Sequence, residues 1–191
     1  VRQAIFYKSP VSQSFAKLTP ETAETPEAPR DPAETPGSGE PFKFIPYILP
    51  FSADARIDAD LSILLAEDNI VNQKVTSLML RKMGFEVDIV QNGRAAVEAM
   101  KDGGYDVILM DKIMPEMDGL EATRQIREMD HIEQPVIIAL TASASMDDEI
   151  ACRRASMDNF LAKPVQFEKM KAGLAFATNH LEKRGKKKPR S

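Results

Sequence analysis

The sequence contains one cysteine and no long apolar run, which excludes an internal disulfide and a membrane-spanning helix from this part of the chain. The single cysteine, Cys152, cannot form an internal disulfide and suits a reducing compartment. No apolar run approaches the roughly 18 residues of a membrane-spanning helix, and the N-terminus lacks the pattern of a signal peptide. We therefore expect a cytoplasmic protein with no membrane segment in this part of the chain.

The charge balance gives no reason to expect a nucleic acid as a direct partner. The chain has 25 Lys and Arg against 29 Asp and Glu, a net charge of -4. Its 191 residues, 43% of them hydrophobic, suit one domain of ordinary size with a segment left over. Because the chain begins with Val1, we expect it to be a piece of a longer polypeptide.

The first sixty residues have no pattern that predicts a folded domain. Residues 1–19 are too few to bury a core, and residues 20–60 are rich in Pro and Glu, which predicts a largely disordered linker. Within this linker, residues 42–51 (FKFIPYILPF) are apolar but broken by Pro46 and Pro50. Two interpretations remain: this segment docks against a domain surface, or it is simply an apolar part of the linker.

From Leu61 onward, short apolar runs alternate with helical patterns. The expected strands are 62–66, 86–90, 105–111, 135–141 and 159–162, each followed by a helix. In the first helix, we expect the apolar face to be formed by Val71, Val75, Leu78 and Met79. Five such repeats predict an α/β domain over residues 61–182, with helices on both faces of a parallel sheet, because the crossovers are right-handed. A basic tail, residues 183–191, follows.

Polar residues stand directly after four of these strands. Glu67 and Asp68 follow the first strand, Asp111 the third, Thr141 the fourth and Lys163 the fifth. In the doubly wound, flavodoxin-like order 2-1-3-4-5, these four strands are neighbours, so the side chains would meet at one edge of the sheet. Three carboxylates this close repel one another unless a cation lies between them, and an all-oxygen set suits Mg²⁺.

Asp111 is the candidate nucleophile of this cluster. A lone aspartate after a strand is usually a cap, but this one would share its edge with two acids, a hydroxyl and an ammonium. With a metal bound, one oxygen of Asp111 stays free to attack phosphorus, while Mg²⁺, Lys163 and Thr141 neutralise the phosphoryl oxygens. The residues therefore predict phosphorylation of Asp111.

Four motifs, LLAEDNIVNQKV, VILMDKIMPEMDG, IIALTA and FLAKPV, together resemble the receiver domain of two-component signalling. The resemblance covers about residues 61–182 and is closest to receivers fused to hybrid histidine kinases, for which the EDNxVNQ stretch is typical. It implies a phosphorelay in which a histidine kinase domain or a histidine phosphotransfer protein passes a phosphoryl group to Asp111. It also implies that the chain is the C-terminal part of a hybrid histidine kinase.

The resemblance assigns roles to single residues. It implies that Asp111 and Asp68 are direct Mg²⁺ ligands, that Glu67 binds the ion through water, and that the carbonyl of Ile113 is a further ligand. It implies that Lys163 pairs with the phosphoryl group and that the Lys163–Pro164 peptide bond is cis.

The resemblance also implies a switch. Thr141 would swing toward the phosphoryl oxygens and Phe160 would move inward behind it, which couples the chemistry to the surface of the fourth helix and fifth strand.

Three positions depart from the family pattern. Lys112 follows the acceptor where such receivers usually carry an apolar or small residue; it could pair with the phosphate, with Glu116 or with a partner, and an exposed, solvated lysine is the default expectation. Ile113 and Ser143 flank the site where polar side chains of some relatives orient the attacking water, which predicts slow self-dephosphorylation.

Residues 4–18 (AIFYKSPVSQSFAKL) faintly resemble the end of a second receiver. If the match is not a chance one, residues 1–19 are the C-terminal end of an upstream, degenerate receiver, and that receiver or the kinase core of the same chain is a further candidate partner.

Two other functional classes were weighed. A receiver that acts as an interaction or autoinhibitory module, without phosphorylation, remains the alternative. An aspartyl-phosphate hydrolase of the haloacid dehalogenase type is excluded, because it needs an acid where this chain has Ile113. His131 and His180 fall outside the predicted pocket, where we expect both to be solvated, and no Gly-rich ATP loop is present, so this piece is not itself a kinase.

Overall fold

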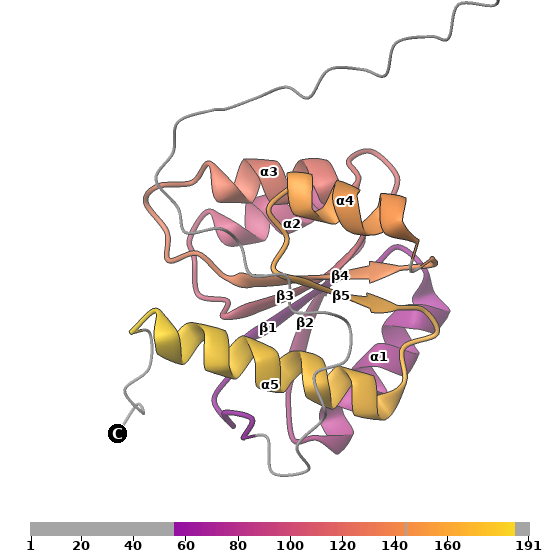
Figure 1. The fold of residues 1–191 in the computed structure, drawn as a ribbon, viewed down its shortest axis with the longest axis vertical. Coiled ribbons are helices and arrows are strands. Elements are labelled where there is room, and N and C mark those ends of the chain that lie inside the picture. Colours follow the sequence, from indigo (N-terminus) through magenta and orange to yellow (C-terminus); the bar gives the residue numbers. More distant parts are fainter. Residues whose placement is uncertain (1–55, 144, 186–191) are drawn as a thin grey trace, which may run out of the picture. The chain divides into compact units, whose positions relative to one another are not determined.

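Five parallel strands form one sheet in the order β2-β1-β3-β4-β5 (Figure 1). The computed structural model describes residues 56–143 and 145–185. The strands are β1 (Ile63–Ala66), β2 (Val87–Val90), β3 (Val107–Asp111), β4 (Val136–Thr141) and β5 (Asn159–Ala162). The helices are α1 (Ile70–Lys82), α2 (Gly93–Met100), α3 (Gly119–Arg127), α4 (Met146–Arg154) and α5 (Phe167–Lys183). The predicted doubly wound α/β fold is confirmed.

The predictions for residues 1–19 and 42–51, and for most of the basic tail, concern residues outside the described ranges. Within the described ranges, none of the helices is long and apolar enough to cross a membrane.

The sheet is covered on both faces. Helices α1 and α5 pack on one face, and α2, α3 and α4 pack on the other (Figure 1). Every residue of β1, β3 and β4 is buried, as expected for central strands that face a helical layer on either side. Alternate residues of β3 feed the two cores: Leu109 packs on the α1–α5 side and Met110 on the α2–α4 side.

Four strands begin one or two residues later than the sequence predicted. The first ladder pairs join Ile63 to Val87 and to Val107, and Val107 in turn to Val136. The residues just before them belong to turns or to isolated hydrogen bonds, such as that from the amide of Asp106 to the carbonyl of Ser62. The sequence pattern therefore overestimates these strands at their amino ends, where the ladder to the neighbouring strand has not yet begun.

The predicted apolar face of α1 was wrong. Val71, Val75 and Leu78 are 67%, 46% and 63% exposed. The residues that α1 buries are Gln73, Thr76, Ser77 and Leu80. The buried polar groups have partners inside the fold, because Gln73 donates to the carbonyl of Glu67 and Ser77 donates to the carbonyl of Gln73, both at 2.7 Å.

The expectation of a solvated His180 was also wrong. Its side chain is 27% exposed, and its Nε2 lies 3.6 Å from an oxygen of Asp158. The imidazole packs against Phe176, with 5.5 Å between the ring centroids. By contrast, His131 is exposed, as expected.

Glycine is required where α3 begins. A Cβ on Gly119 would lie 2.1 Å from the carbonyl oxygen of Asp111. The first turn of α3 therefore touches the backbone at the end of β3, and its amide donates to the carbonyl of Lys112 at 3.0 Å. Asp118 caps the helix by accepting from the amide of Glu121 at 2.8 Å.

Candidate phosphoryl-acceptor site

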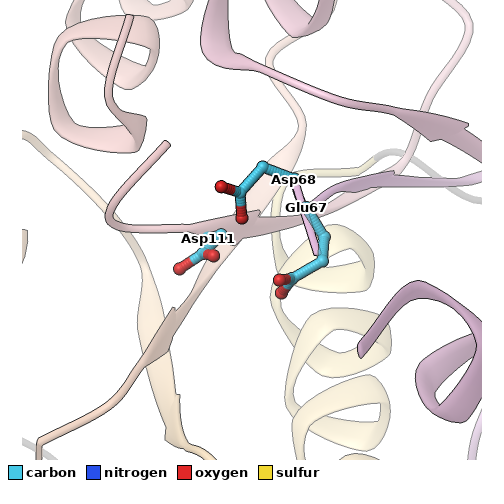
Figure 2. A group of neighbouring side chains, drawn as sticks. All are labelled: Glu67, Asp68 and Asp111. Carbon is cyan, nitrogen blue, oxygen red and sulfur yellow. The ribbon is translucent and has the colours of Figure 1, made fainter. Parts of the chain in front are cut away.

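Three carboxylates gather at the carboxyl edge of the sheet. Glu67 and Asp68 follow β1, and Asp111 ends β3; each offers an oxygen that lies within 4.8 Å of the others (Figure 2). The sheet register explains the meeting, since Ala66 pairs with Met110 and the next residue of each strand stands at the same level. The structure therefore brings together the three acids that the sequence analysis grouped.

Lys163 completes the cluster. Its Nζ lies 2.6 Å from Oε2 of Glu67 and 2.7 Å from Oδ2 of Asp111, so one ammonium bridges two carboxylates. The backbone places it, because the amide of Lys163 donates to the carbonyl of Thr141 at 2.7 Å. The Lys163–Pro164 peptide bond is cis.

The electrostatics of the cluster follow from burial. Glu67 is fully buried and Asp111 is 6% exposed, whereas Asp68 is exposed. Burial raises the pKa of Asp111 and the charge of Glu67 adds to the rise, while Lys163 and the amide of Ile113 oppose it. Burial works against the charge of Lys163, but its bonds to Asp111 and Glu67 outweigh this and raise its pKa. Three acids with one ammonium leave excess negative charge at this edge.

The donor set fits Mg²⁺. Three carboxylates supply hard oxygen ligands, and a divalent cation would offset the negative charge that Lys163 leaves uncompensated. The amide of Ile113 donates to Oδ1 of Asp111 at 3.3 Å, which places the Ile113 peptide beside the acceptor. The role of the Ile113 carbonyl as a ligand stays a prediction.

Two residues that the sequence analysis quoted only within a motif hold Glu67 in place. Asn72 donates from Nδ2 to Oε1 of Glu67 at 2.9 Å, and Gln73 donates from Nε2 to its carbonyl at 2.7 Å. Both come from the first turns of α1, which follows Glu67 directly. The signal that could have found them is the pair of polar residues on a helix that starts at an acidic strand end.

Thr141 lies at the same edge, at the end of β4, and is 1% exposed. Its hydroxyl donates to the carbonyl of Ser143 at 2.8 Å, so the hydroxyl is hydrogen-bonded within the loop that follows β4. Phe160 is half-buried in β5 and packs against the core under α2, α3 and α4. The movements implied for Thr141 and Phe160 stay predictions.

Lys112 is not the exposed lysine that the default expectation described. Its side chain is 17% exposed, and its ammonium forms an ion pair with the carboxylate of Asp148 in the first turn of α4, which is 15% exposed. By contrast, the side chain of Ile113 is 69% exposed. The sequence pattern marks Asp148 only as the residue three positions after the helix cap Ser145, and it does not reveal Asp148 as the partner of Lys112.

A flavodoxin-like sheet with an acidic cluster and a lysine at its carboxyl edge is the arrangement found in receiver domains. The family model of the response regulator receiver domain matches residues 63–175. The chain belongs to this family.

Curated relatives are hybrid and other histidine kinases. Hybrid signal transduction histidine kinase B of Dictyostelium discoideum is 47% identical over 115 residues, which are 54% of this chain and 6% of that protein. Histidine protein kinase 1 of Candida albicans is 41% identical over 115 residues, 55% of this chain and 5% of that protein. The chain thus spans less than a tenth of the length of these relatives.

Solved structures give the same result. The receiver domain of a sensor histidine kinase from Pseudomonas aeruginosa, with a magnesium ion in its active-site cleft, is 41% identical, with a TM-score of 0.57 over 62% of this chain and 98% of that one. A second match comes from the co-crystal structure of the Saccharomyces cerevisiae histidine phosphotransfer protein Ypd1 with the receiver domain of Ssk1. It is 31% identical, with a TM-score of 0.57 over 60% of this chain and 86% of that one.

Proposed function

We propose that this receiver domain accepts a phosphoryl group on Asp111 from a phosphohistidine, carried by a histidine kinase domain or a histidine phosphotransfer protein. The observation that carries the proposal is the cluster itself: Asp111 shares one ammonium, Lys163, with Glu67 and lies beside Asp68. An acidic cluster built only for stability would not leave excess negative charge at the edge of a buried strand.

The chemistry is a direct transfer. One carboxylate oxygen of Asp111 forms a bond to phosphorus while the phosphorus–nitrogen bond of the donor breaks, and the imidazole leaves with the electron pair. Lys163, already 2.7 Å from Asp111, neutralises the incoming phosphoryl oxygens. Thr141 would exchange its bond to Ser143 for one to the phosphoryl group, and Phe160 would follow it inward.

A magnesium site is part of the proposal. Asp68, Asp111 and the carbonyl of Ile113 would hold the ion directly and Glu67 through water. When bound, Mg²⁺ supplies positive charge for the phosphoryl oxygens. Support comes from the donor set of this chain and from the magnesium ion in the related receiver of 41% identity.

The exposed apolar stripe of α1 offers a docking surface for the donor. We define the α1 stripe as Ile70, Val71, Val75 and Leu78, all of which are at least 46% exposed. The stripe begins two residues after Asp68, so a partner seated on it would lie next to the acidic cluster. A helical phosphotransfer protein fits this surface, since an apolar helix face can pack against the stripe while its histidine reaches Asp111.

The parent protein is a hybrid histidine kinase in this proposal. The named relatives support it, and the kinase core or an upstream receiver of the same chain would be further partners. Such a relay, with a single cysteine in the chain, is consistent with a cytoplasmic location.

Intact-mass spectrometry after incubation with acetyl phosphate and Mg²⁺ tests the acceptor. We expect a single phosphoryl adduct that requires Mg²⁺, is lost in Asp111→Asn and persists in Asp102→Asn, an exposed aspartate outside the cluster. A folded sample that binds Mg²⁺ but forms no adduct would overturn the proposal in favour of a receiver that acts as an interaction module without phosphorylation.

A further inference from the structure

The ion pair between Lys112 and Asp148 joins the residue after the acceptor to the first turn of α4. The backbone of Lys112 is fixed on both sides: its amide donates to the carbonyl of Leu140 at 3.1 Å, and its carbonyl accepts from the amide of Gly119 at 3.0 Å. Because side chains alternate along β3, Lys112 points to the α4 side of the sheet, opposite to Asp111. The ammonium therefore acts on α4 and not on the metal site.

A second observation places the ammonium against the inner side of α4. Burial raises the pKa of the Cys152 thiol, and the charge of Lys112 opposes this rise. Cys152 is the residue of α4 that is buried, and every residue of this helix is described. Lys112 thus contacts Asp148 while lying near Cys152, on the face of α4 that packs on the sheet.

Helix α4 itself contributes one buried side chain, Cys152, to the core, and its C-cap residue Ala155 contributes a second. Met146 and Ile150 are 70% and 40% exposed, so few apolar side chains anchor the helix. When an ion pair is largely shielded from water, removing one partner leaves the other charge poorly solvated. The loss of either partner is therefore destabilising. The Lys112–Asp148 pair therefore adds a sheltered polar contact at the first turn of α4 to the packing of Cys152 nearer its end.

The pair holds the far end of the segment on which the proposed switch depends. Thr141 ends β4, its hydroxyl is bound by Ser143, and α4 begins five residues later at Met146. The start of this segment is held by Thr141 and its end by Lys112. The contact with Ser143 keeps Thr141 turned toward its own loop, and the ion pair fixes the first turn of α4 at the other end of the segment.

We propose that Lys112 is a positioning residue that latches α4 in the unphosphorylated domain. Phosphorylation of Asp111 would release this latch through the segment between β4 and α4, because Thr141 would leave the carbonyl of Ser143 for the phosphoryl group and so shift the segment that leads to Asp148. The release rests on the proposed function, because it requires phosphorylation of Asp111. The role of Lys112 in holding α4 does not.

Hydrogen exchange of the α4 amides, measured without any phosphoryl donor, tests the latch. We expect Lys112→Met and Asp148→Asn each to exchange about tenfold faster over residues 146–154, with little change in α1 or α5. The double variant should exchange no faster than the quicker single variant, because both changes remove the same contact.

Matched controls separate the pair from general effects. Asp147→Asn removes the same charge from the same helical turn at an exposed position, and Lys74→Met removes an exposed lysine of α1; both should exchange within about twofold of the native protein. Equal acceleration in Asp147→Asn and Asp148→Asn would overturn the latch. Acceleration spread evenly over all helices would overturn it too, because that indicates global destabilisation.

Repeating the measurement on the phosphorylated protein tests the release. We expect phosphorylation to accelerate α4 exchange in the native protein but hardly further in Lys112→Met. An adduct on Asp111 that leaves α4 exchange unchanged would overturn the release step alone. Absence of an adduct in every variant would refute the proposed function and with it the release, while the result on the unphosphorylated protein would still decide the latch.

Discussion

The two oxygens of Glu67 have different partners. Oε1 accepts from the side chain of Asn72 at 2.9 Å, and Oε2 lies 2.6 Å from Nζ of Lys163. The amide of Asn69 also donates to Oε1, at 3.4 Å. Because the side chain is fully buried, no solvent competes for these oxygens, and the three partners decide where the carboxylate points. A carboxylate that holds a metal through water needs such support, since outer contacts orient the ligand.

We therefore expect Asn72→Ala to weaken Mg²⁺ binding about tenfold, because Glu67 loses the nearer of the two donors to Oε1. Isothermal titration calorimetry with MgCl₂, at constant ionic strength, measures the dissociation constant directly. Asn179→Ala, the same substitution at an exposed position of α5, is the control and should bind like the native protein. A native dissociation constant in a folded Asn72→Ala sample would show that Asn72 does not position Glu67.

The second residue-scale prediction concerns Ile113. Its side chain is 69% exposed and lies two residues after Asp111, where it offers no polar atom to orient a water molecule. We expect the phosphorylated domain to persist for minutes or longer and Ile113→Gln to shorten its lifetime several-fold. Intact mass followed over time after removal of acetyl phosphate gives both rates. Decay of the native adduct within seconds would contradict the prediction.

At the scale of elements, α1 shows why hydrophobic pattern alone can select the wrong face. The helix has two stripes at helical spacing: the apolar α1 stripe and a mostly polar stripe that ends in Leu80. The polar stripe faces the sheet because Gln73 reaches the carbonyl of Glu67, a contact that no periodicity reveals. The apolar stripe is left exposed, in agreement with the docking role proposed for it.

Leu78 and Leu80, which lie on the exposed and the buried stripe of α1, test this orientation. Leu80→Ala removes a fully buried side chain and should lower the free energy of unfolding by about 2–5 kcal/mol. Leu78→Ala, at a position that is 63% exposed, should change it by less than about 0.5 kcal/mol.

Urea unfolding followed by circular dichroism measures both values. Leu78→Ala should nevertheless slow phosphoryl transfer from a histidine phosphotransfer protein while leaving the reaction with acetyl phosphate unchanged. Equal rates from both donors would show that the α1 stripe does not receive the partner.

The same contrast explains how much of the site could be read from the sequence. The ends of buried strands are visible as apolar runs that stop at a charge, so Glu67, Asp111 and Lys163 could be placed at one edge before the structure was known. The pairing of Lys112 with Asp148 could not, because it depends on the rotation of α4 about its axis. The spacing of Asp148 from Ser145 indicates a helix start, but nothing in it tells which of the three successive acids at 147, 148 and 149 meets Lys112.

At the scale of the whole molecule, Asp158 ties the amino edge of the sheet together. It precedes β5 and pairs with Arg127 of α3 at 2.6 Å, accepts from the amide of Ile137 at 2.8 Å, and lies 3.4 Å from Arg184 after α5. His180 of α5 approaches the same carboxylate but makes no hydrogen bond through its buried Nε2. This edge lies opposite to the acidic cluster, so it affects stability without touching the chemistry.

His180 should make the stability of the domain depend on pH. Burial lowers its pKa below the ordinary value, Asp158 opposes the shift, and the charges of Arg184, Arg127 and Lys183 add to it. The folded protein therefore holds this proton less tightly than the unfolded chain does. The stability that neutral His180 contributes is fully present above the ordinary histidine pKa and is lost as pH falls through it toward the folded pKa.

We expect the melting temperature of the native protein to fall between pH 7.5 and 5.5 and that of His180→Gln to fall less over the same range. Differential scanning calorimetry in buffers of constant ionic strength measures both slopes, and the difference between them removes the contribution of carboxylates common to both proteins. His131→Gln, at an exposed histidine, is the control for loss of an imidazole and should keep the native slope. If His180→Gln and His131→Gln show the same slope, protonation of His180 does not loosen the Asp158 edge, and the acid sensitivity must come from the carboxylates.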